Sequence, residues 1–287
     1  MPEVTIVEVA PRDGLQNYER AVETAQKIAF IDALAGAGAR VIEAASFVNP
    51  AAVPLMADAA AVMAGINRKP DVRYVALVPN IRGLDRAVAA RVDSIALFAA
   101  ATEEFSQANL SASIDAAFRR FEAVMESAGP RGLWVRGYLS VAFHCPFSGH
   151  VPVEQALNAI RQLRNLGCDE IALADTTGMA GPDHVNRLVN AALELVPARQ
   201  LALHFHDTRG RAIDNIQVGY DLGVRVFDSS AGGIGGCPFS PGAPGNVATE
   251  AVVDHFEQAG VRTGIAADLV RAAYRRHVLA LDAGEYS

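Results

Sequence analysis

Short apolar runs rich in β-branched residues alternate with longer amphipathic segments along most of the sequence. Eight runs are predicted to be strands: Thr5–Val9, Arg40–Ala44, Val72–Val78, Ser94–Phe98, Leu133–Leu139, Glu170–Ala174, Leu201–His206 and Val224–Asp228. Segments between them show helical periodicity, as in Thr24–Ala37, Ser113–Ala128, Pro152–Leu166, Pro182–Val196 and Ala212–Leu222. Eight strand–helix units of this length predict a closed parallel (β/α)8 barrel, or TIM barrel, of the α/β class. A doubly wound open sheet is the alternative.

The connections fit the same architecture. Glycine precedes several predicted strands, as in Leu166–Ile171 and Leu222–Val226, which is typical of helix-to-strand loops. No low-complexity tract or Ser/Gly linker divides the sequence. We therefore expect residues 1–287 to form a single catalytic domain. An extra C-terminal helix, about Ala267–Leu281, is predicted to follow the barrel and close one of its ends.

Composition and charge exclude several classes of protein. The net charge is −7 without a basic stripe, so we expect no nucleic-acid partner. No apolar run approaches the roughly 18 residues that a membrane span needs, and the first residues resemble neither a secretory nor a transit peptide. Cys145, Cys168 and Cys237 form no disulfide framework, which favours a cytoplasmic location. A homo-oligomer, a dimer or higher, is compatible with the sequence, which does not fix the oligomeric state.

Unusual polar residues lie where a barrel enzyme places its catalytic groups, at the C-terminal ends of strands and in the loops that follow. They are Arg12 and Asp13, Glu43 and Ser46, Tyr138 and Ser140, Asp175–Gly178, His204–Asp207, and the segment Gly232–Asn246. Because parallel strands of a barrel end at the same face, we expect these residues to gather there.

His204 and His206 give the sharpest indication of chemistry. Residues i and i+2 of a strand point to the same face, so both imidazoles should face the barrel mouth. Asp13 follows the first predicted strand. In a closed ring of eight strands, only the eighth strand lies between the first and the seventh, so Asp13 should lie close to the two histidines. Two imidazoles, a carboxylate and waters suit Mg²⁺ or Mn²⁺ better than a structural zinc. The alternative is a structural pair of histidines bonded to backbone carbonyls.

Arg12 precedes the predicted ligand Asp13. A structural ion pair with Glu43 is one interpretation. The other is an electrophile whose fixed guanidinium stabilises a developing enolate or carboxylate oxygen. Both can hold, because Glu43 could orient Arg12.

The segment Gly232–Asn246 is rich in glycine and proline and long for a loop after a strand, which favours a mobile lid. A phosphate-binding loop is the competitor, but the Lys-Ser/Thr of a P-loop is missing. Cys237 lies within this segment. It is either an inert small side chain or a proton donor or acceptor above the metal site.

Lysine is scarce, and this constrains carbon–carbon bond chemistry. Only Lys27 and Lys69 occur, the first in a predicted helix and the second just before the third strand. Neither position allows a Schiff base in the barrel mouth. Such chemistry would have to depend on the metal.

Five segments together resemble the 3-hydroxy-3-methylglutaryl-CoA lyase family, which belongs to a superfamily of metal-dependent lyases and acyltransferases with TIM-barrel folds. They are VEVAPRDGLQN (Val7–Asn17), VIEAASFVNP (Val41–Pro50), LADTTG (Leu173–Gly178), LHFHDTRG (Leu203–Gly210) and GGIGGCPFSPGAPGN (Gly232–Asn246). The resemblance runs in order from about residue 4 to residue 275.

The resemblance implies a retro-Claisen cleavage of an acyl-CoA thioester that gives acetyl-CoA and acetoacetate. It implies Mg²⁺ or Mn²⁺ on Asp13, His204, His206 and Asn246, with His204 also in a catalytic role. Arg12 would stabilise the enolate of the departing acetyl-CoA, Glu43 would orient Arg12 and metal-bound waters, and Cys237 would transfer a proton. The residues implied to bind substrate are Arg12, Gln16, Ser46, Asn109, Tyr138 and Thr176.

The sequence departs from the family pattern around the acyl group. Ala51 and Ala52 replace a Lys-Trp pair, and Ala172 replaces a serine expected near the acyl carboxylate. The metal and proton-transfer residues are kept. 3-Hydroxy-3-methylglutaryl-CoA is the leading substrate, and another acyl chain, such as that of citramalyl-CoA, is the rival.

Three other functions remain as alternatives. A condensing acyltransferase would need a further C-terminal region, for which the sequence up to Ser287 leaves little room. A biotin-linked carboxyltransferase would need a modified lysine in its barrel. The third alternative is a non-catalytic metal-binding or interaction module on a barrel scaffold.

Overall fold

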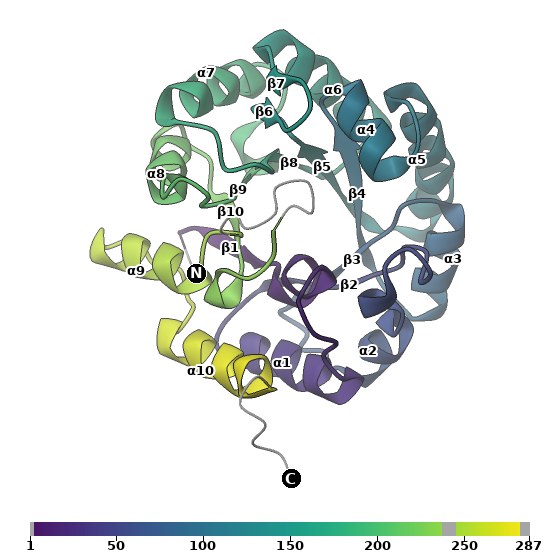
Figure 1. Ribbon diagram of the computed structural model, residues 1–287, viewed down its shortest axis with the longest axis vertical. Helices are drawn as coiled ribbons and strands as arrows, with labels where there is room; N and C mark the ends of the chain where they lie inside the picture. Colours follow the sequence, from purple (N-terminus) through teal and green to yellow (C-terminus); the bar gives the residue numbers. More distant parts are fainter. Residues whose placement is uncertain (1–2, 237–244, 282–287) are drawn as a thin grey trace.

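The computed structural model describes residues 3–236 and 245–281. Its main sheet is a closed parallel barrel with the strand order β1-β10-β9-β8-β5-β4-β3-β2 (Figure 1). The barrel strands are β1 (Thr5–Glu8), β2 (Val41–Ser46), β3 (Arg73–Leu77), β4 (Ser94–Ala100), β5 (Trp134–Ser140), β8 (Glu170–Asp175), β9 (Leu201–Phe205) and β10 (Val226–Ser229). All eight predicted strands are present, with ends shifted by one or two residues, so the predicted barrel is confirmed.

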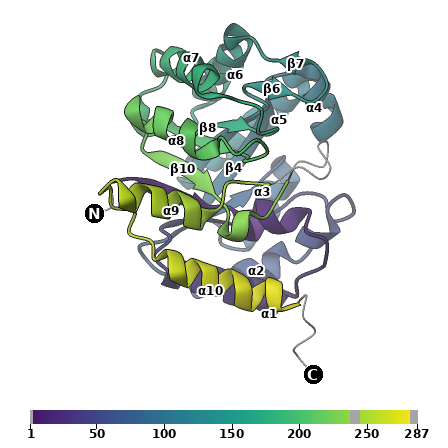
Figure 2. The same cartoon turned by 60° about the vertical axis from the view of Figure 1, so that its left-hand side comes forward.

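Helices surround the barrel (Figures 1 and 2). They are α1 (Thr24–Gly36), α2 (Ala59–Gly65), α3 (Ile81–Ala89), α4 (Glu103–Leu110), α5 (Ile114–Ala128), α6 (Val153–Leu166), α7 (Pro182–Leu193), α8 (Ala212–Asp221), α9 (Thr249–Gln258) and α10 (Ala267–His277). Short helical turns are η1 (Ala10–Gly14), η2 (Pro54–Met56), η3 (Gly129–Arg131), η4 (Ala198–Gln200), η5 (Ala231–Gly233) and η6 (Leu279–Leu281). Within the described residues, no helix is both long and apolar enough to span a membrane.

Helix α5 illustrates how the sequence forms these outer helices. The Ser113 hydroxyl accepts a hydrogen bond from the Ala116 N–H at 3.2 Å and so caps the first turn, which typically contributes about 1 kcal/mol. Phe118, Phe121 and Val124 recur every three residues and are buried, so one face of the helix packs inward.

The final helix does not take its predicted place. Helix α10 lies beside α1 and next to α9 in the outer ring, rather than closing an end of the barrel (Figures 1 and 2). Its buried residues Val270 and Ala273 are three apart, so a narrow apolar stripe packs sideways against neighbouring helices. Such a stripe suits a groove between helices better than the broad opening of a barrel.

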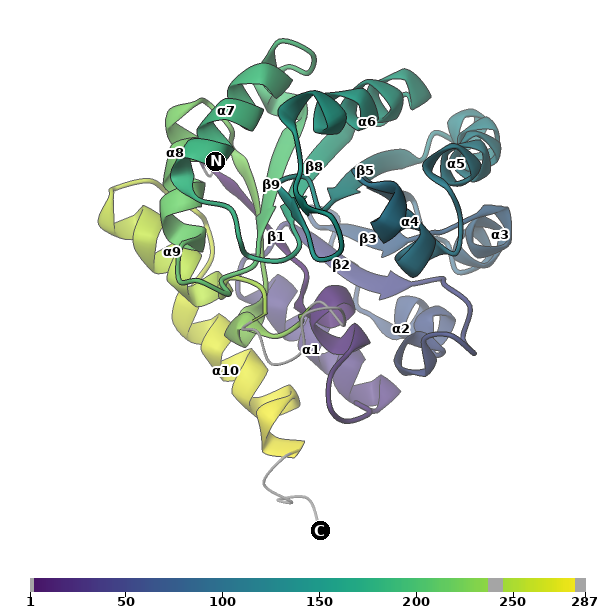
Figure 3. The ribbon, with the colours of Figure 1, turned by 45° about the horizontal axis from the view of Figure 1, so that its top comes forward.

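Two features near the mouth are absent from the predicted elements. A short antiparallel hairpin of β6 (His144–Cys145) and β7 (Gly149–His150) follows β5, and its strands are too short to show alternation. Helix α4 follows β4 and lies nearer the barrel centre than α5 (Figures 1 and 3). Both elements therefore lie close to the end of the barrel where the polar residues gather.

Candidate metal centre and active site

Asp13, His204 and His206 come together at the C-terminal mouth of the barrel. Each offers one ligand atom, and these atoms lie within 4.8 Å of one another. The two imidazole centroids are 5.4 Å apart, as expected for residues i and i+2 at the end of one strand. Among the described residues this is the only cluster of at least three His, Cys, Asp or Glu side chains so arranged. The structure thus unites the three residues predicted to hold a metal.

Asp13 lies in the tight turn η1 directly after β1. The amides of Arg12, Asp13 and Gly14 all point to the Val9 carbonyl, which holds the turn compact. Burial raises the pKa of the Asp13 carboxyl, but Arg12, His204 and His206 outweigh burial and lower that pKa to about 2. Asp13 is therefore an anion at neutral pH, as a metal ligand must be.

Asn246 completes a four-residue donor set. Its Nδ2 donates to Asp13 Oδ2 at 2.7 Å and to the Ile234 carbonyl at 3.1 Å. Its Oδ1 is buried and has no hydrogen-bond partner within residues 3–236 and 245–281. A buried acceptor without a partner is uncommon and indicates an absent ligand. The residues therefore fit a divalent cation, which would take one oxygen from Asp13, one from Asn246 and two imidazole nitrogens.

The backbone fixes Asn246 against the histidine strand. His206 and Asn246 form an antiparallel bridge, and the Val247 amide donates to the Phe205 carbonyl at 3.1 Å. Gly235 lies opposite with φ +97°, where a Cβ would approach Asn246 Nδ2 at 2.8 Å and the Asp13 carbonyl at 2.9 Å. A residue without a Cβ is needed there for Asp13 and Asn246 to meet.

Asp228, at the end of β10, orients His204. Its Oδ2 lies 3.1 Å from His204 Nδ1, and its Oδ1 accepts from Arg136 Nη2 at 2.6 Å. Burial raises the pKa of Asp228, but Arg136 and His204 outweigh burial and hold it below its usual range. An ionised carboxylate can only accept, so His204 Nδ1 carries the proton and Nε2 is left free for a metal.

His206 is buried like His204. Burial, followed by its neighbour His204, lowers the pKa of the His206 imidazole to about 4. His206 is thus neutral at physiological pH, which is the form that ligates metals.

Arg12 links the predicted metal ligand to Glu43. Its Nη1 donates to Asp13 Oδ1 and its Nη2 to Glu43 Oε2, both at 2.7 Å. Despite burial, Glu43 and Asp13 raise the pKa of Arg12 above its usual range. A further donor, Arg12 Nε, is buried and unpartnered among the described residues. The structural ion pair and the electrophilic interpretation are therefore compatible.

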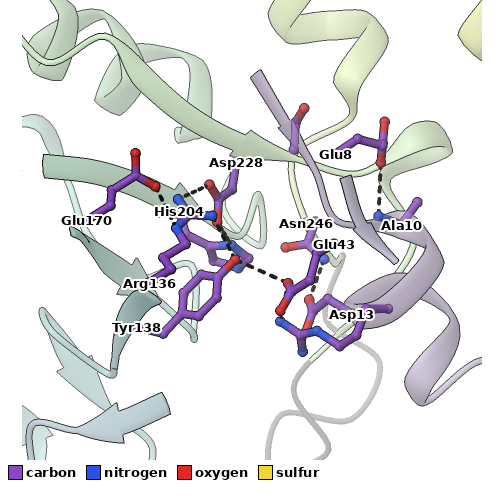
Figure 4. A network of polar contacts seen from close by, with 12 residues as sticks. Glu8, Ala10, Asp13, Glu43, Arg136, Tyr138, Glu170, His204, Asp228 and Asn246 are labelled. Carbon is purple, nitrogen blue, oxygen red and sulfur yellow. Dashed lines mark hydrogen bonds and ion pairs between the residues drawn. The ribbon is translucent and has the colours of Figure 1, made fainter. Parts of the chain in front are cut away.

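Tyr138 extends this contact into the barrel interior. Its hydroxyl donates to Glu43 Oε2 at 3.1 Å and accepts from Arg136 Nη1 at 2.9 Å (Figure 4). Burial raises the pKa of the phenol well above its ordinary value. Tyr138 therefore remains a neutral donor that holds one oxygen of Glu43, while Glu43 Oε1 has no partner among the described residues.

A bulge in β2 brings Ser46 to the same side as Glu43. Glu43 pairs with Val75 and Ser46 with Leu77, with a register shift between Glu43 and Ala45. Val75 and Leu77 are two residues apart and so share a face, and partners in a parallel pair share it too. Ser46 Oγ is buried and unpartnered in the described part of the chain. It is therefore available to a ligand.

The other predicted substrate residues differ in their surroundings. Gln16 has a buried, unpartnered Oε1 within the described chain. Thr176 Oγ1 accepts from the Val141 amide at 2.9 Å and helps to shape the loop after β8. Asn109 is exposed on α4, so its role stays a prediction. Cys237, the predicted proton carrier, lies outside the described residues.

Sequence reasoning missed Arg136, Glu170 and Glu8 and assigned no role to Asp228. All four are ionisable side chains that lie buried or nearly buried inside barrel strands. Charged residues within apolar strand runs were the available signal, because such charges are costly to bury unless they are paired.

The two lysines lie away from the site, as expected. Lys27 Nζ bonds the Leu55 carbonyl and Asp58, at 2.6 and 2.7 Å. Lys69 Nζ bonds the Ala35 carbonyl at 3.1 Å. Neither side chain reaches the barrel mouth.

Fold and site together define a (β/α)8-barrel protein with a candidate site for one divalent metal at its C-terminal mouth. The model of the HMGL-like family matches residues 3–275, and the chain belongs to this family.

Named relatives cover most of the chain. It is 45% identical over 262 residues to the 3-hydroxy-3-isohexenylglutaryl-CoA/hydroxy-methylglutaryl-CoA lyase of Pseudomonas aeruginosa, covering 91% of this chain and 87% of the relative. The HMG-CoA lyase structure from Brucella melitensis matches with a TM-score of 0.94 and 48% identity, covering 98% and 99% of the two chains. An Acinetobacter baumannii HMG-CoA lyase, solved with coenzyme A and 3-methylmalate, matches with a TM-score of 0.93, 38% identity and coverages of 97% and 91%.

Proposed function

We propose that this protein is a metal-dependent carbon–carbon lyase that cleaves 3-hydroxy-3-methylglutaryl-CoA to acetyl-CoA and acetoacetate. The main support is that Asp13, His204 and His206 converge, with Arg12 hydrogen-bonded to Asp13, in a member of the HMGL-like family. The relative solved with coenzyme A supports an acyl-CoA substrate.

The chain's own residues suit the charges of a retro-Claisen reaction. A bound divalent cation would supply Lewis-acid polarisation of the substrate's hydroxyl and carbonyl oxygens. Asp13, His204, His206 and Asn246 would hold that cation. Arg12, fixed by Glu43, lies beside Asp13 and would stabilise the thioester enolate, a contact typically worth about 3–4 kcal/mol at the transition state. Cys237 would deliver the proton that converts the enolate to acetyl-CoA.

The finer assignments belong to the same proposal. Mg²⁺ or Mn²⁺ is the expected ion because the donor set is mixed nitrogen and oxygen. Gln16, Ser46, Asn109, Tyr138 and Thr176 would surround the acyl group. Residues 1–287 would act as one catalytic domain. A cytoplasmic location fits the free thiols of Cys145 and Cys168.

A second candidate substrate carries a different acyl chain. Ala172 is fully buried and pairs in register with Tyr138, so no hydroxyl is present where the family resemblance predicts one. A relative 45% identical is named for both an isohexenylglutaryl and a methylglutaryl thioester. A lyase acting on a bulkier or different 3-hydroxyacyl-CoA is therefore the alternative.

Assays of the purified protein with Mg²⁺ test the proposal. 3-Hydroxy-3-methylglutaryl-CoA, its isohexenyl analogue and citramalyl-CoA are compared by the acetyl-CoA each releases. Preferred cleavage of the first supports the leading assignment, and a higher kcat/KM with either of the others selects the alternative. No acetyl-CoA from any of them rejects the lyase.

A further inference from the structure

A chain of buried polar contacts runs beneath the candidate metal site from His204 to Asp13 (Figure 4). On the histidine side, Asp228 lies between His204 Nδ1, at 3.1 Å, and Arg136 Nη2, at 2.6 Å. His204 comes from β9, Asp228 from β10 and Arg136 from β5, so three strands contribute to this half.

On the other side, the chain continues from Arg136 to the turn after β1. Arg136 Nη1 donates to the Tyr138 hydroxyl at 2.9 Å, which donates to Glu43 at 3.1 Å. Glu43 accepts from Arg12 at 2.7 Å, and Arg12 donates to Asp13 at the same distance. Arg136 is the junction of the two halves.

Arg136 is itself held firmly. It is 1% exposed, and Glu170 Oε1 lies 3.0 Å from its Nε on the side away from the candidate metal site. A guanidinium held by the buried Asp228 and Tyr138, and by an ion pair with the partly buried Glu170, has no room to change partners without leaving a charge unpaired. The geometry therefore fixes which atoms Arg136 offers to Asp228 and Tyr138.

We propose that Arg136 is a positioning residue that, through Asp228, fixes which ring nitrogen of His204 faces the metal. The inference deepens the proposed metal-dependent function and rests on it. A guanidinium only donates, so Arg136 takes one acceptor oxygen of Asp228 and leaves the other for His204. His204 must then donate from Nδ1 and present the lone pair of Nε2 to the barrel mouth.

The substitution Asp228→Asn should change the tautomer of His204 and so weaken metal binding. The Asn amide has one acceptor and one donor group, and Arg136 claims the acceptor because it has no acceptor of its own. The amide N–H then faces His204 Nδ1, which must become the acceptor, so the proton moves to Nε2. A protonated Nε2 cannot ligate, and we expect Mn²⁺ affinity to fall about 10–100-fold, as for other outer partners of metal ligands.

Removing the arginine should reverse the effect. In the double variant Arg136→Met, Asp228→Asn, no donor claims the amide oxygen, so the Asn side chain can turn that oxygen toward His204. Nδ1 then carries the proton again, and most of the lost Mn²⁺ affinity should return. A role limited to packing predicts the opposite, since two substitutions in one buried network should damage the protein more than one.

Two measurements test whether Arg136 fixes the tautomer of His204. Long-range ¹H–¹⁵N spectra of the metal-free protein report the His204 tautomer, assigned by comparison with His204→Gln. Titration with Mn²⁺ gives the dissociation constant without using activity. Asp58→Asn is the matched control, because it changes an Asp in another ion pair, with Lys27 at 2.7 Å, and should leave both readouts unchanged.

The expected result is an Nδ1–H tautomer in the wild type, an Nε2–H tautomer with weak Mn²⁺ binding in Asp228→Asn, and recovery in the double variant. An unchanged tautomer in a folded Asp228→Asn protein, or no recovery in a folded double variant, overturns the proposal. If either protein does not fold, Arg136→Lys, Asp228→Asn serves, because lysine also only donates, still claims the amide oxygen and should keep the Nε2–H tautomer. An Nδ1–H tautomer in that folded variant overturns the proposal too. Lyase activity of the wild type is measured separately, so failure of the proposed function is recognised independently.

Discussion

Two groups of buried carboxylates lie in neighbouring parts of the barrel and are neutralised differently. Beneath the candidate metal site, Glu43 and Asp228 contact the guanidinium groups of Arg12 and Arg136 at 2.7 and 2.6 Å. At the base of the segment Gly232–Asn246, Glu8 has only uncharged donors among the residues that the structure describes. These are the amides of Ala10 and Ala231, each at 2.9 Å, and the Thr249 hydroxyl at 2.7 Å.

The difference appears in the charge states. Arg136 and His204 hold the pKa of Asp228 below its usual range, although burial opposes them. Burial instead raises the pKa of Glu8 to about 7, and the hydrogen bonds from Ala10, Thr249 and Ala231 offset only part of this. Nearby Glu250 adds to the increase, and it accepts the Gly232 amide at 3.1 and 3.2 Å. Arginine thus maintains permanent charge where a metal is to be held, whereas the base of the segment relies on neutral hydrogen bonds.

Removing the charge at the candidate metal site should have the largest effect. Asp13→Ala deletes a proposed anionic ligand and the acceptor of both Arg12 and Asn246. We expect Mn²⁺ binding to be lost and kcat/KM to fall by more than about a thousandfold, because metal and electrophile are both disturbed. Equilibrium dialysis and a turnover assay measure the two losses, with exposed Asp214→Ala as the control. Full turnover by an Asp13→Ala protein without metal would refute the metal site.

Replacing an arginine of the charged group by lysine tests geometry at constant charge. Arg12→Lys cannot bond Asp13 and Glu43 simultaneously, because an ammonium lacks the guanidinium fork. We expect kcat to fall about 10²–10³-fold, while Mn²⁺ affinity changes much less. Arg40→Lys, in the exposed pair with Asp71, should retain full activity. Near-normal kcat in Arg12→Lys would show that the fork is unnecessary and that positive charge alone suffices.

The comparison also shows which parts of the molecule could be predicted from the sequence. The alternation of strands and helices predicts the eight-stranded ring, and the ring places Asp13 near β9 because only β10 separates β1 from β9. The spacing of His204 and His206 predicts the rest of the candidate metal cluster. These features depend on local periodicity and closure of the ring, both of which the sequence expresses directly.

The contacts beneath the candidate metal site could not be predicted in this way. Arg136 and Asp228 are 92 residues apart and meet only because their side chains cross the barrel interior. The bulge between Glu43 and Ala45 has no glycine or proline to mark it, yet it determines the face on which Ser46 lies. Such features depend on side-chain packing across the ring and on local register, which periodicity does not encode.

Glu8, whose hydrogen-bond donors are uncharged, should make the stability of the protein depend on pH. The pKa of Glu8 is about 7 in the folded protein and 4.5 in the unfolded chain. The contribution of Glu8 to the free energy of unfolding is therefore complete below pH 4.5 and is lost as the pH rises through 7. Glu8→Gln does not titrate. The free energy of unfolding of the wild type, relative to this variant, should therefore fall by up to about 3 kcal/mol between pH 5 and pH 8.5. Urea unfolding of both proteins measures this difference, and parallel pH profiles would contradict the raised pKa.

The smallest effect is expected from Thr249→Val, which tests whether Glu8 and the arginine-paired carboxylates are independent. Thr249 is fully buried, and its hydroxyl lies 2.7 Å from Glu8 Oε2 and 2.8 Å from Ser229 Oγ. Thr249→Val keeps the shape but removes both bonds, so we expect a loss of about 1–2 kcal/mol of unfolding free energy. Mn²⁺ affinity should stay within about twofold of the wild type, because no charged partner of the metal ligands is touched. If Thr249→Val instead weakens Mn²⁺ binding as strongly as Asp228→Asn, the contacts of Glu8 and those of the arginine-paired carboxylates act as one unit. The two groups of carboxylates would then not be independent.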